Sequence, residues 1–355
     1  MKVVVATGGT GGHVLPALRL AERLTADGDE VWMCGALKPW WRRRARETGI
    51  PVKTWRVEGL LGRPPLQTLE AGVKMAVAVR RAMGWLKTVD PEVVVGFGGY
   101  AAFPATLAGV LLRYPVVLHE QNAVAGLANK ALARAADRVA VGFACAKTGF
   151  PASKVVWTGC PLGFGPCGED PKTVRRRLGL AQDGLTLLVV GGSQGSREIN
   201  QLFLDTLDMF GTTAPFQVVH ISGEKDYQTV KKAYNQKGIS AVVFSFCDRM
   251  AEVYRACDAV IARAGALTVM EIASVGLPAL LIPYPYAGAH QEANARALRA
   301  AGPARVLPPD RRTPAELKAG LAWLIARAGG ECEYKGIHRP EAAERLARLL
   351  KEVCS

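Results

Sequence analysis

One histidine, His13, follows a glycine-rich turn and gives the N-terminal half of the chain a base that titrates near neutral pH. The turn reads Gly-Gly-Thr-Gly-Gly over residues 8–12 and comes directly after the apolar run Val3–Ala6. A helix that begins at such a turn exposes its first N–H groups, which can bind an anion or approach a sugar closely. General-base catalysis is one interpretation of His13. A helix-capping or core histidine is the alternative.

Two polar clusters follow later apolar runs of the same half. Residues 96–100 read Gly-Phe-Gly-Gly-Tyr, and residues 119–122 read His-Glu-Gln-Asn. The carboxyl ends of parallel strands form the edge where α/β sheets bind ligands. Four consecutive polar residues exceed the needs of a plain turn. We therefore expect Glu120 and Asn122 to belong to a functional site.

The second half repeats this design. Residues 191–195 read Gly-Gly-Ser-Gln-Gly after an apolar strand, with the Ser193 hydroxyl as a donor. At residues 262–271 another strand ends, small residues follow, and a helix begins whose N-terminus can face a diphosphate. Glu271 lies one turn into that helix, where a carboxylate can accept two ribose hydroxyls or merely complement the helix dipole. Residues 290–294 supply amides suited to sugar hydroxyls.

Several cofactor classes are not expected. Val14 stands where a dinucleotide fingerprint needs its third glycine, and no Lys-Ser or Lys-Thr completes a P-loop. The only Asp-x-Asp pair, Asp27 and Asp29, precedes a strand and so lies away from the ligand edge. We predict no nicotinamide cofactor and no bound metal.

The pattern predicts an α/β fold of two doubly wound parallel sheets. Short buried runs bounded by turn residues are typical of parallel strands that are covered on both faces. A cluster of glycines and prolines over residues 159–171 marks the boundary. We expect domains at residues 1–160 and 161–339, with a C-terminal helix at 340–353 that packs back on the first. The expected strands are 3–6, 31–34, 93–96, 116–119 and 138–141, then 185–190, 216–221, 241–244, 259–262 and 279–282.

The charge is concentrated in the first half. Of the net +14, residues 1–160 carry +10, with 21 Lys and Arg against 11 Asp and Glu. Nucleic acid, an anionic membrane or an acidic substrate could each explain this. Trp-Trp-Arg-Arg-Arg at 40–44 and the mixed segment 69–86 favour a membrane surface. Two ordinary amphipathic helices with solvated basic faces are the alternative.

No membrane span or secretion signal is expected. The longest charge-free stretch, residues 93–112, is interrupted by glycines and Pro104, and the first glycine-rich turn comes too early for a signal sequence. The eight cysteines form no Cys-x-x-Cys pair, so we expect reduced cytosolic thiols.

Together these motifs, in this order, resemble the MurG family of bacterial glycosyltransferases. The resemblance implies a GT-B fold, two Rossmann-like domains that face a central cleft. It also implies inverting transfer of N-acetylglucosamine from UDP-N-acetylglucosamine (UDP-GlcNAc) to the muramoyl 4-hydroxyl of undecaprenyl-linked lipid I. The product is lipid II of peptidoglycan. The family works without a bound metal, at the cytoplasmic face of the cell membrane, with other cell-wall synthesis proteins as possible partners and no nucleic acid.

The resemblance also assigns site residues. In the first, acceptor and membrane-facing domain, His13 is the base, Glu120 shapes the acceptor site, and Asn122 contacts the N-acetylglucosamine. In the second, UDP-sugar donor domain, Glu271 binds the ribose and Gln291 the sugar hydroxyls. The remaining positions line the donor sugar and acceptor edge (Thr10, Gly11 and Gly12), the diphosphate (Ser193, Ala266, Leu267, Thr268, Val269 and Met270) and, through its backbone, the uracil (Cys247).

Two segments depart from the family pattern. Where the family reads Gly-Asn-Pro-Val-Arg, residues 159–163 read Gly-Cys-Pro-Leu-Gly, so the arginine that reaches toward the donor nucleotide is replaced by Gly163. A lost charge-assisted contact to phosphate costs about 1.5–3 kcal/mol, or roughly 10–100-fold in affinity. The family's Leu-Arg-Gly-Lys-Gly loop is also altered, at residues 60–64. Two alternatives stay open: a transferase with another lipid acceptor, such as diacylglycerol, and a weakly active nucleotide-sugar-binding paralogue.

Overall fold

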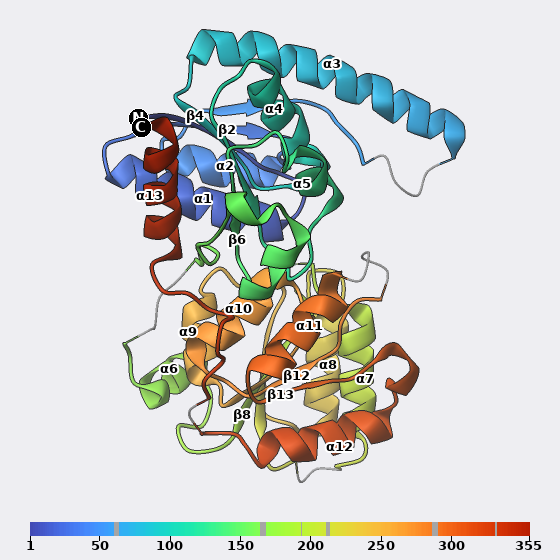
Figure 1. Ribbon diagram of the computed structural model, residues 1–355. Helices are drawn as coiled ribbons and strands as arrows, with labels where there is room; N and C mark the ends of the chain where they lie inside the picture. Colours follow the sequence, from blue (N-terminus) through green and yellow to red (C-terminus); the bar gives the residue numbers. More distant parts are fainter. Residues whose placement is uncertain (60–63, 164–167, 193, 211–213, 286–289, 331) are drawn as a thin grey trace. The chain divides into compact units, whose positions relative to one another are not determined.

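The chain divides into two compact units, which a computed structural model describes. One unit comprises Met1–Gly163 together with Arg339–Ser355, and the other comprises Phe164–His338. The structure describes residues 1–59, 64–163, 168–192, 194–210, 214–285, 290–330 and 332–355. Each unit is an α/β layer structure with a parallel sheet at its centre (Figure 1).

The sheet of the first unit has the strand order β3-β2-β1-β4-β5-β6-β7, and every neighbouring pair is parallel. Its central strands are apolar and buried on both faces because helices cover both. The strands are β1 (Lys2–Ala6), β2 (Glu30–Gly35), β3 (Val52–Thr54), β4 (Val93–Gly96), β5 (Val116–Glu120), β6 (Arg138–Val141) and β7 (Val155–Trp157).

Helices α1, α2 and α13 cover one face of this sheet, and α3, α4 and α5 the other (Figure 1). The C-terminal helix α13 packs Leu346 and Leu350 into the same core as Leu20 and Leu24 of α1. The helices are α1 (Gly11–Ala26), α2 (Pro39–Glu47), α3 (Pro65–Val89), α4 (Gly99–Leu111), α5 (Leu127–Leu132) and α13 (Ala342–Cys354), with short 3-10 turns at Ala144–Gly149 and Ala152–Lys154.

The sheet of the second unit has the order β10-β9-β8-β11-β12-β13 and is also parallel throughout. Helices α7, α8 and α12 share a core on one face of it, built around Leu187, Val189, Phe203 and Leu321. The strands are β8 (Thr186–Val190), β9 (Gln217–Ile221), β10 (Ala241–Phe244), β11 (Ala259–Ala262), β12 (Ala279–Leu281) and β13 (Ala304–Val306). The helices are α6 (Pro171–Leu178), α7 (Arg197–Leu207), α8 (Tyr227–Lys237), α9 (Met250–Ala256), α10 (Ala266–Val275), α11 (His290–Ala301) and α12 (Pro314–Ile325), with a 3-10 turn at Pro309–Arg311.

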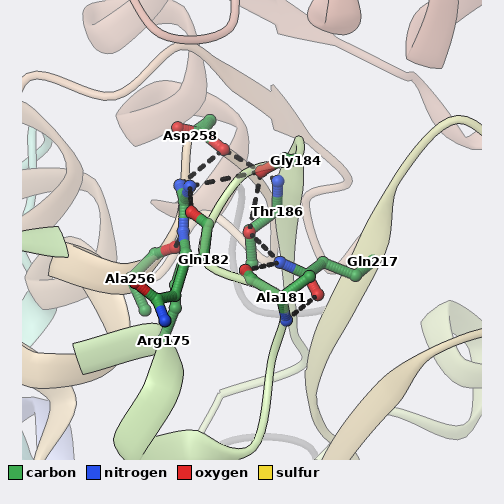
Figure 2. A network of polar contacts seen from close by, with 8 residues as sticks. All are labelled: Arg175, Ala181, Gln182, Gly184, Thr186, Gln217, Ala256 and Asp258. Carbon is green, nitrogen blue, oxygen red and sulfur yellow. Dashed lines mark hydrogen bonds and ion pairs between the residues drawn. The ribbon is translucent and has the colours of Figure 1, made fainter. Parts of the chain in front are cut away.

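A buried arginine forms hydrogen bonds at the amino ends of β8 and β11. Figure 2 shows the Arg175 guanidinium of α6 bonded to Asp258 Oδ2 at 2.8 Å and to the carbonyls of Ala256, Gln182 and Gly184. The same Asp258 oxygen accepts the Thr186 N–H at the start of β8. This network stabilises the edge of the sheet that lies opposite the carboxyl ends of β8 and β11.

All ten strands expected from the sequence are present, with ends that differ by at most one residue. Three further strands, β3, β7 and β13, have three residues each and lie at sheet edges. Such short, half-exposed runs carry too little apolar pattern to be recognised. No helix within the described part of the chain is both long and apolar enough to cross a membrane.

Candidate functional site

In the first unit, the candidate residues gather where the strand order reverses. Strands β1 and β4 are neighbours, with Ala6 opposite Gly96, although they are far apart in the chain. The turn that ends at His13 and the turn that ends at Gly99 therefore leave the sheet side by side. Ligands of open α/β sheets bind at such a reversal, outside the carboxyl ends of the strands.

His13 lies in the first turn of α1, and its imidazole rests against the second glycine turn. A side chain at Gly99 would place its Cβ 3.6 Å from His13 Nε2. On the other side of the ring, Nδ1 lies 3.2 Å from the Thr10 hydroxyl. The His13 carbonyl also accepts a hydrogen bond of 2.9 Å from the Thr7 hydroxyl. The ring is thus fixed by its neighbours while it remains partly exposed.

Glycine is required beneath this histidine. The backbone at Gly8 has φ of 144°, and a Cβ there would lie 2.6 Å from the Ala36 carbonyl oxygen. At Gly35 a Cβ would lie only 1.9 Å from the Thr7 carbonyl oxygen. The two loops approach so closely that no side chain fits between them.

Glu120 is an anchor for the loop that follows β5. Its side chain is buried, and its two oxygens accept four hydrogen bonds of 2.8–3.1 Å. The donors are the Asn122 N–H and amide, the Gly126 N–H and the Asn129 amide. A carboxylate held by so many donors favours a positioning role over direct proton transfer.

A buried histidine supports the same loop. His119 Nε2 bonds the Gly159 carbonyl at 3.0 Å, and its Nδ1 accepts the Gln121 amide at 3.0 Å. Burial lowers the pKa of His119 to about 4. At neutral pH this ring is uncharged and fixed in one tautomer, so His119 is a structural element of the loop.

In the second unit, the corresponding reversal lies between β8 and β11, where Val190 is opposite Ala262. Helix α10 begins immediately after β11, with Gly265 as its N-cap. Within the described residues, the N–H groups of Ala266, Leu267 and Thr268 have no backbone acceptor. They form the positive end of the helix dipole at the ligand edge of the sheet. Val269 and Met270 are buried and hold the helix to the core.

A cationic cluster stabilises the loops beside this helix. The Arg263 guanidinium donates to Glu198 Oε2 at 2.6 Å, to Ser196 Oγ at 2.8 Å and to the Ile282 carbonyl at 3.0 Å. Arg312 bonds the other Glu198 oxygen. Two largely buried guanidinium groups thus share one carboxylate, and the cluster keeps a net positive charge.

Three predicted contact residues lie in the second unit, and one of them, Glu271, belongs to α10 itself. Glu271 accepts a hydrogen bond of 3.1 Å from the Tyr254 hydroxyl. Gln291, in the first turn of α11, accepts the Tyr284 N–H at 2.9 Å. Cys247 lies between β10 and α9, half-buried, and burial raises the pKa of its thiol.

Other predictions fall elsewhere. Ser193 and residues 60–63 of the altered loop lie outside the described residues. Gly163 is described, and a Cβ there would lie 3.4 Å from the Arg19 guanidinium. Asp27 and Asp29 are engaged in ion pairs, with Arg23 and the N-terminal amine respectively.

Sequence reasoning missed several supporting residues. Asn129 and Asn200 are buried amides that bond loop carbonyls and carboxylates, and Tyr254 is a buried hydroxyl. In the sequence, the sign of such a residue is a polar side chain at a helix position that would otherwise be apolar. This sign is weak because polar residues at exposed helix positions give the same sequence pattern.

The comparisons with known proteins agree with this geometry. Residues 3–141 match the glycosyltransferase family 28 N-terminal domain, and residues 186–331 match the family 28 C-terminal domain. A transferase from Nitrosococcus oceani is 37% identical over 100% of this chain and 99% of its own length, and one from Alkalilimnicola ehrlichii is 38% identical over 99% of each. Both are named UDP-N-acetylglucosamine–N-acetylmuramyl-(pentapeptide) pyrophosphoryl-undecaprenol N-acetylglucosamine transferase.

The chain belongs to the MurG family. The crystal structure of Acinetobacter baumannii MurG is 31% identical, covers 99% of each chain, and superposes with a TM-score of 0.76. The two Rossmann-like units are therefore those of a GT-B glycosyltransferase, as predicted. The full-length match to MurG transferases supports a lipid-linked acceptor of the muramoyl class over a diacylglycerol acceptor.

Proposed function

We propose that this MurG-family chain transfers N-acetylglucosamine from UDP-GlcNAc to the muramoyl 4-hydroxyl of lipid I. In this reaction the acceptor oxygen attacks the anomeric carbon, the bond from that carbon to the diphosphate oxygen breaks, and UDP leaves. The acceptor proton passes to a base, and the anomeric centre inverts. The observation that carries the proposal is the His13 imidazole, fixed between Thr10 and Gly99 at the strand reversal of the first unit.

His13 is the proposed base. Its imidazole is partly exposed and held in place by Thr10, so a substrate hydroxyl can approach a ring nitrogen. The glycines that precede it, Gly11 and Gly12, let a sugar approach the start of α1 without obstruction. Glu120 and Asn122 then form the loop that shapes the acceptor site, with Asn122 contacting the N-acetylglucosamine.

The donor is the proposed ligand of the second unit. The N–H groups at the start of α10, which have no backbone acceptor among the described residues, and the net positive Arg263 cluster suit a diphosphate. Glu271 binds the ribose hydroxyls, Gln291 the sugar hydroxyls, the Cys247 backbone the uracil, and Ser193 the diphosphate. N–H groups and arginines together can meet the charge of the leaving group without a metal.

We further propose that the first unit docks on an anionic membrane, at the cytoplasmic face where the charged nucleotide sugar is present. Helix α3 exposes an apolar stripe of Leu66, Leu69, Val73 and Val77, which are 46–79% exposed. These positions recur every three or four residues and so share one helix face.

The segment 69–86, which the sequence suggested as a membrane surface, is only partly exposed. Met75 is buried, Lys74 is paired with Glu58 and Glu70, and Trp85 packs edge-on against Trp55 at 6.0 Å. Basic residues do adjoin the stripe. Toward the end of α3, a shallow pocket of about 370 Å³ is lined by Lys53, Arg81, Gly84, Trp85 and Thr88. An apolar stripe beside cations is the arrangement that interfacial helices use.

The test is transfer of radiolabelled N-acetylglucosamine from UDP-GlcNAc to a lipid I analogue. His13→Ala is expected to reduce turnover by about 10²–10⁴-fold, while UDP-GlcNAc still binds. UDP-GlcNAc binding without turnover on any lipid acceptor would instead support the weakly active, nucleotide-sugar-binding alternative.

A further inference from the structure

The carboxylate proposed to hold the ribose has a buried tyrosine as its partner. Glu271 lies on α10, and the hydroxyl of Tyr254, on α9, donates to its Oε2 at 3.1 Å. Tyr254 is only 1% exposed, so its ring cannot leave without disturbing the core. Among the described residues, Glu271 Oε1 has no hydrogen-bond partner, although the side chain is only partly exposed.

We infer that Tyr254 is a positioning residue for donor recognition: it fixes one oxygen of Glu271 and leaves the other to accept the ribose hydroxyls of a nucleoside diphosphate sugar. The inference rests on the proposed function, since it assumes that Glu271 faces the ribose. It adds a residue from a different helix to the donor site. That residue contacts no ligand and acts through Glu271.

The electrostatics around Glu271 support this role. Burial raises the pKa of Glu271 to about 7, and the Tyr254 hydrogen bond opposes that rise. Charged residues of the adjoining helix α11, Glu292, Arg296 and Arg299, are not among the groups that shift this pKa. Cys257, at the end of α9, influences Tyr254 but not Glu271. Among the described residues, Tyr254 is thus the hydrogen-bond donor that favours the ionised carboxylate.

The protonation state of Glu271 determines how many ribose hydrogen bonds it can accept. An ionised carboxylate accepts hydrogen bonds from both ribose hydroxyls, whereas a protonated one loses part of that capacity. Removal of the Tyr254 hydroxyl raises the Glu271 pKa further, because the hydrogen bond to the charged form is gone. Donor affinity then falls most at neutral and acidic pH and is regained as the pH rises.

The experiment is isothermal titration calorimetry with UDP-GlcNAc between pH 6 and 8.5, on the full chain without acceptor. Tyr254→Phe removes one oxygen and keeps the ring. We expect roughly 10-fold weaker binding at pH 7, a pH midpoint moved upward, and recovery to within about threefold at pH 8.5. Glu271→Gln removes the titrating group, so its affinity is expected to be low and to lack this pH dependence.

Tyr234→Phe is the matched control. Tyr234 is equally buried in the same unit and bonds His220 Nδ1 at 2.9 Å, on the other face of the sheet. Tyr234→Phe should lower the stability of the unit by a similar amount without changing the pH dependence of UDP-GlcNAc binding. A second readout is the preference for UDP-GlcNAc over its 2′-deoxyuridine analogue, which Tyr254→Phe should reduce and Tyr234→Phe should not.

The outcomes separate the inference from the function it rests on. If the native chain binds UDP-GlcNAc and Tyr254→Phe keeps the same affinity, pH midpoint and ribose preference, Tyr254 does not position Glu271. If Tyr254→Phe folds poorly, the Glu271→Gln chain decides: an unchanged pH profile and ribose preference in that variant overturn the inference. If the native chain fails to bind UDP-GlcNAc, the proposed function fails first.

Discussion

The hydroxyl of Thr10 lies 3.2 Å from Nδ1 of His13 and so bears on which imidazole nitrogen can act as a base. Thr10 occupies the N-cap position of α1, yet its side chain makes no cap hydrogen bond. When Nδ1–H donates to the hydroxyl, the lone pair resides on Nε2, beside Gly99. Because a hydroxyl can also donate, this contact orients the ring in either tautomer, and Nε2 is the basic atom in the tautomer that donates from Nδ1.

Replacement of Thr10 by valine tests this relationship. Valine keeps the shape and removes the hydroxyl, so the hydrogen bond that orients the His13 ring is lost. We expect Thr10→Val to lower kcat by about 10-fold with UDP-GlcNAc affinity unchanged. Thr10→Ser should restore turnover. Equal kcat for all three chains in the radiolabel assay would show that the hydroxyl does not orient His13.

The apolar stripe of α3 gives a second prediction. Leu69→Glu combined with Val73→Glu places two charges on an exposed face without altering the core. We expect sedimentation with vesicles rich in phosphatidylglycerol to fall by at least about 10-fold, since each change opposes burial in the headgroup region.

Met209→Glu is the matched control for the stripe. Met209 is 43% exposed and belongs to the second unit, so the same change there should leave vesicle binding intact. Equal binding of the double variant and the native chain would show that the docking surface does not include this stripe. Turnover on a soluble lipid I analogue should stay near that of the native chain in both variants.

Strand positions were predictable because buried parallel strands are short, apolar and bounded by turns. Runs such as Val93–Gly96 and Ala259–Ala262 stand out in any window, and their carboxyl ends locate the site loops. His13 was predictable for the same reason. It follows the glycine-rich turn that ends the apolar strand β1.

The hydrogen bonds of the site and the exposed face of α3 could not be predicted, because they depend on tertiary contacts. The sequence around Glu120 does not show that its carboxylate accepts four hydrogen bonds. Two of the donors, Gly126 and Asn129, reach the carboxylate only after the loop folds. Likewise, residues 74–85 alternate apolar and basic side chains, but packing against α4 decides which of them face solvent. Met75 is buried for that reason, and Leu69 is not.

The glycine at position 163 gives a third prediction. If position 163 faces the donor as the family pattern implies, an arginine there adds a charge-assisted phosphate contact, so Gly163→Arg is expected to tighten UDP-GlcNAc binding by about 10-fold. The Arg19 guanidinium lies 3.4 Å from the new Cβ and must move, which Arg19→Ala in the same chain would permit.

Gly163→Gln separates charge from bulk in this test. Glutamine has comparable reach and no charge, so it should leave affinity near the native value. If glutamine and arginine have the same effect in calorimetry, position 163 does not act through charge.

The Arg175 network gives a stability prediction. Among the described residues, Arg175→Leu leaves the Thr186 N–H as the donor to Asp258, and it removes a donor from three carbonyls (Figure 2). Removing one partner of a buried ion pair costs about 3–5 kcal/mol. For a unit of this size we expect a loss of roughly 6–20 °C in the midpoint of thermal unfolding.

Arg176→Leu is the control, because Arg176 is the exposed neighbour of Arg175 on the same helix. Exposed substitutions change stability by about 0.5 kcal/mol or less, so this variant should melt close to the native chain. Calorimetry should also show that only the transition of the second unit moves, since Arg175 and all its partners belong to that unit. Equal melting of the two variants would mean that the other contacts of β8 and β11 hold this edge without the arginine.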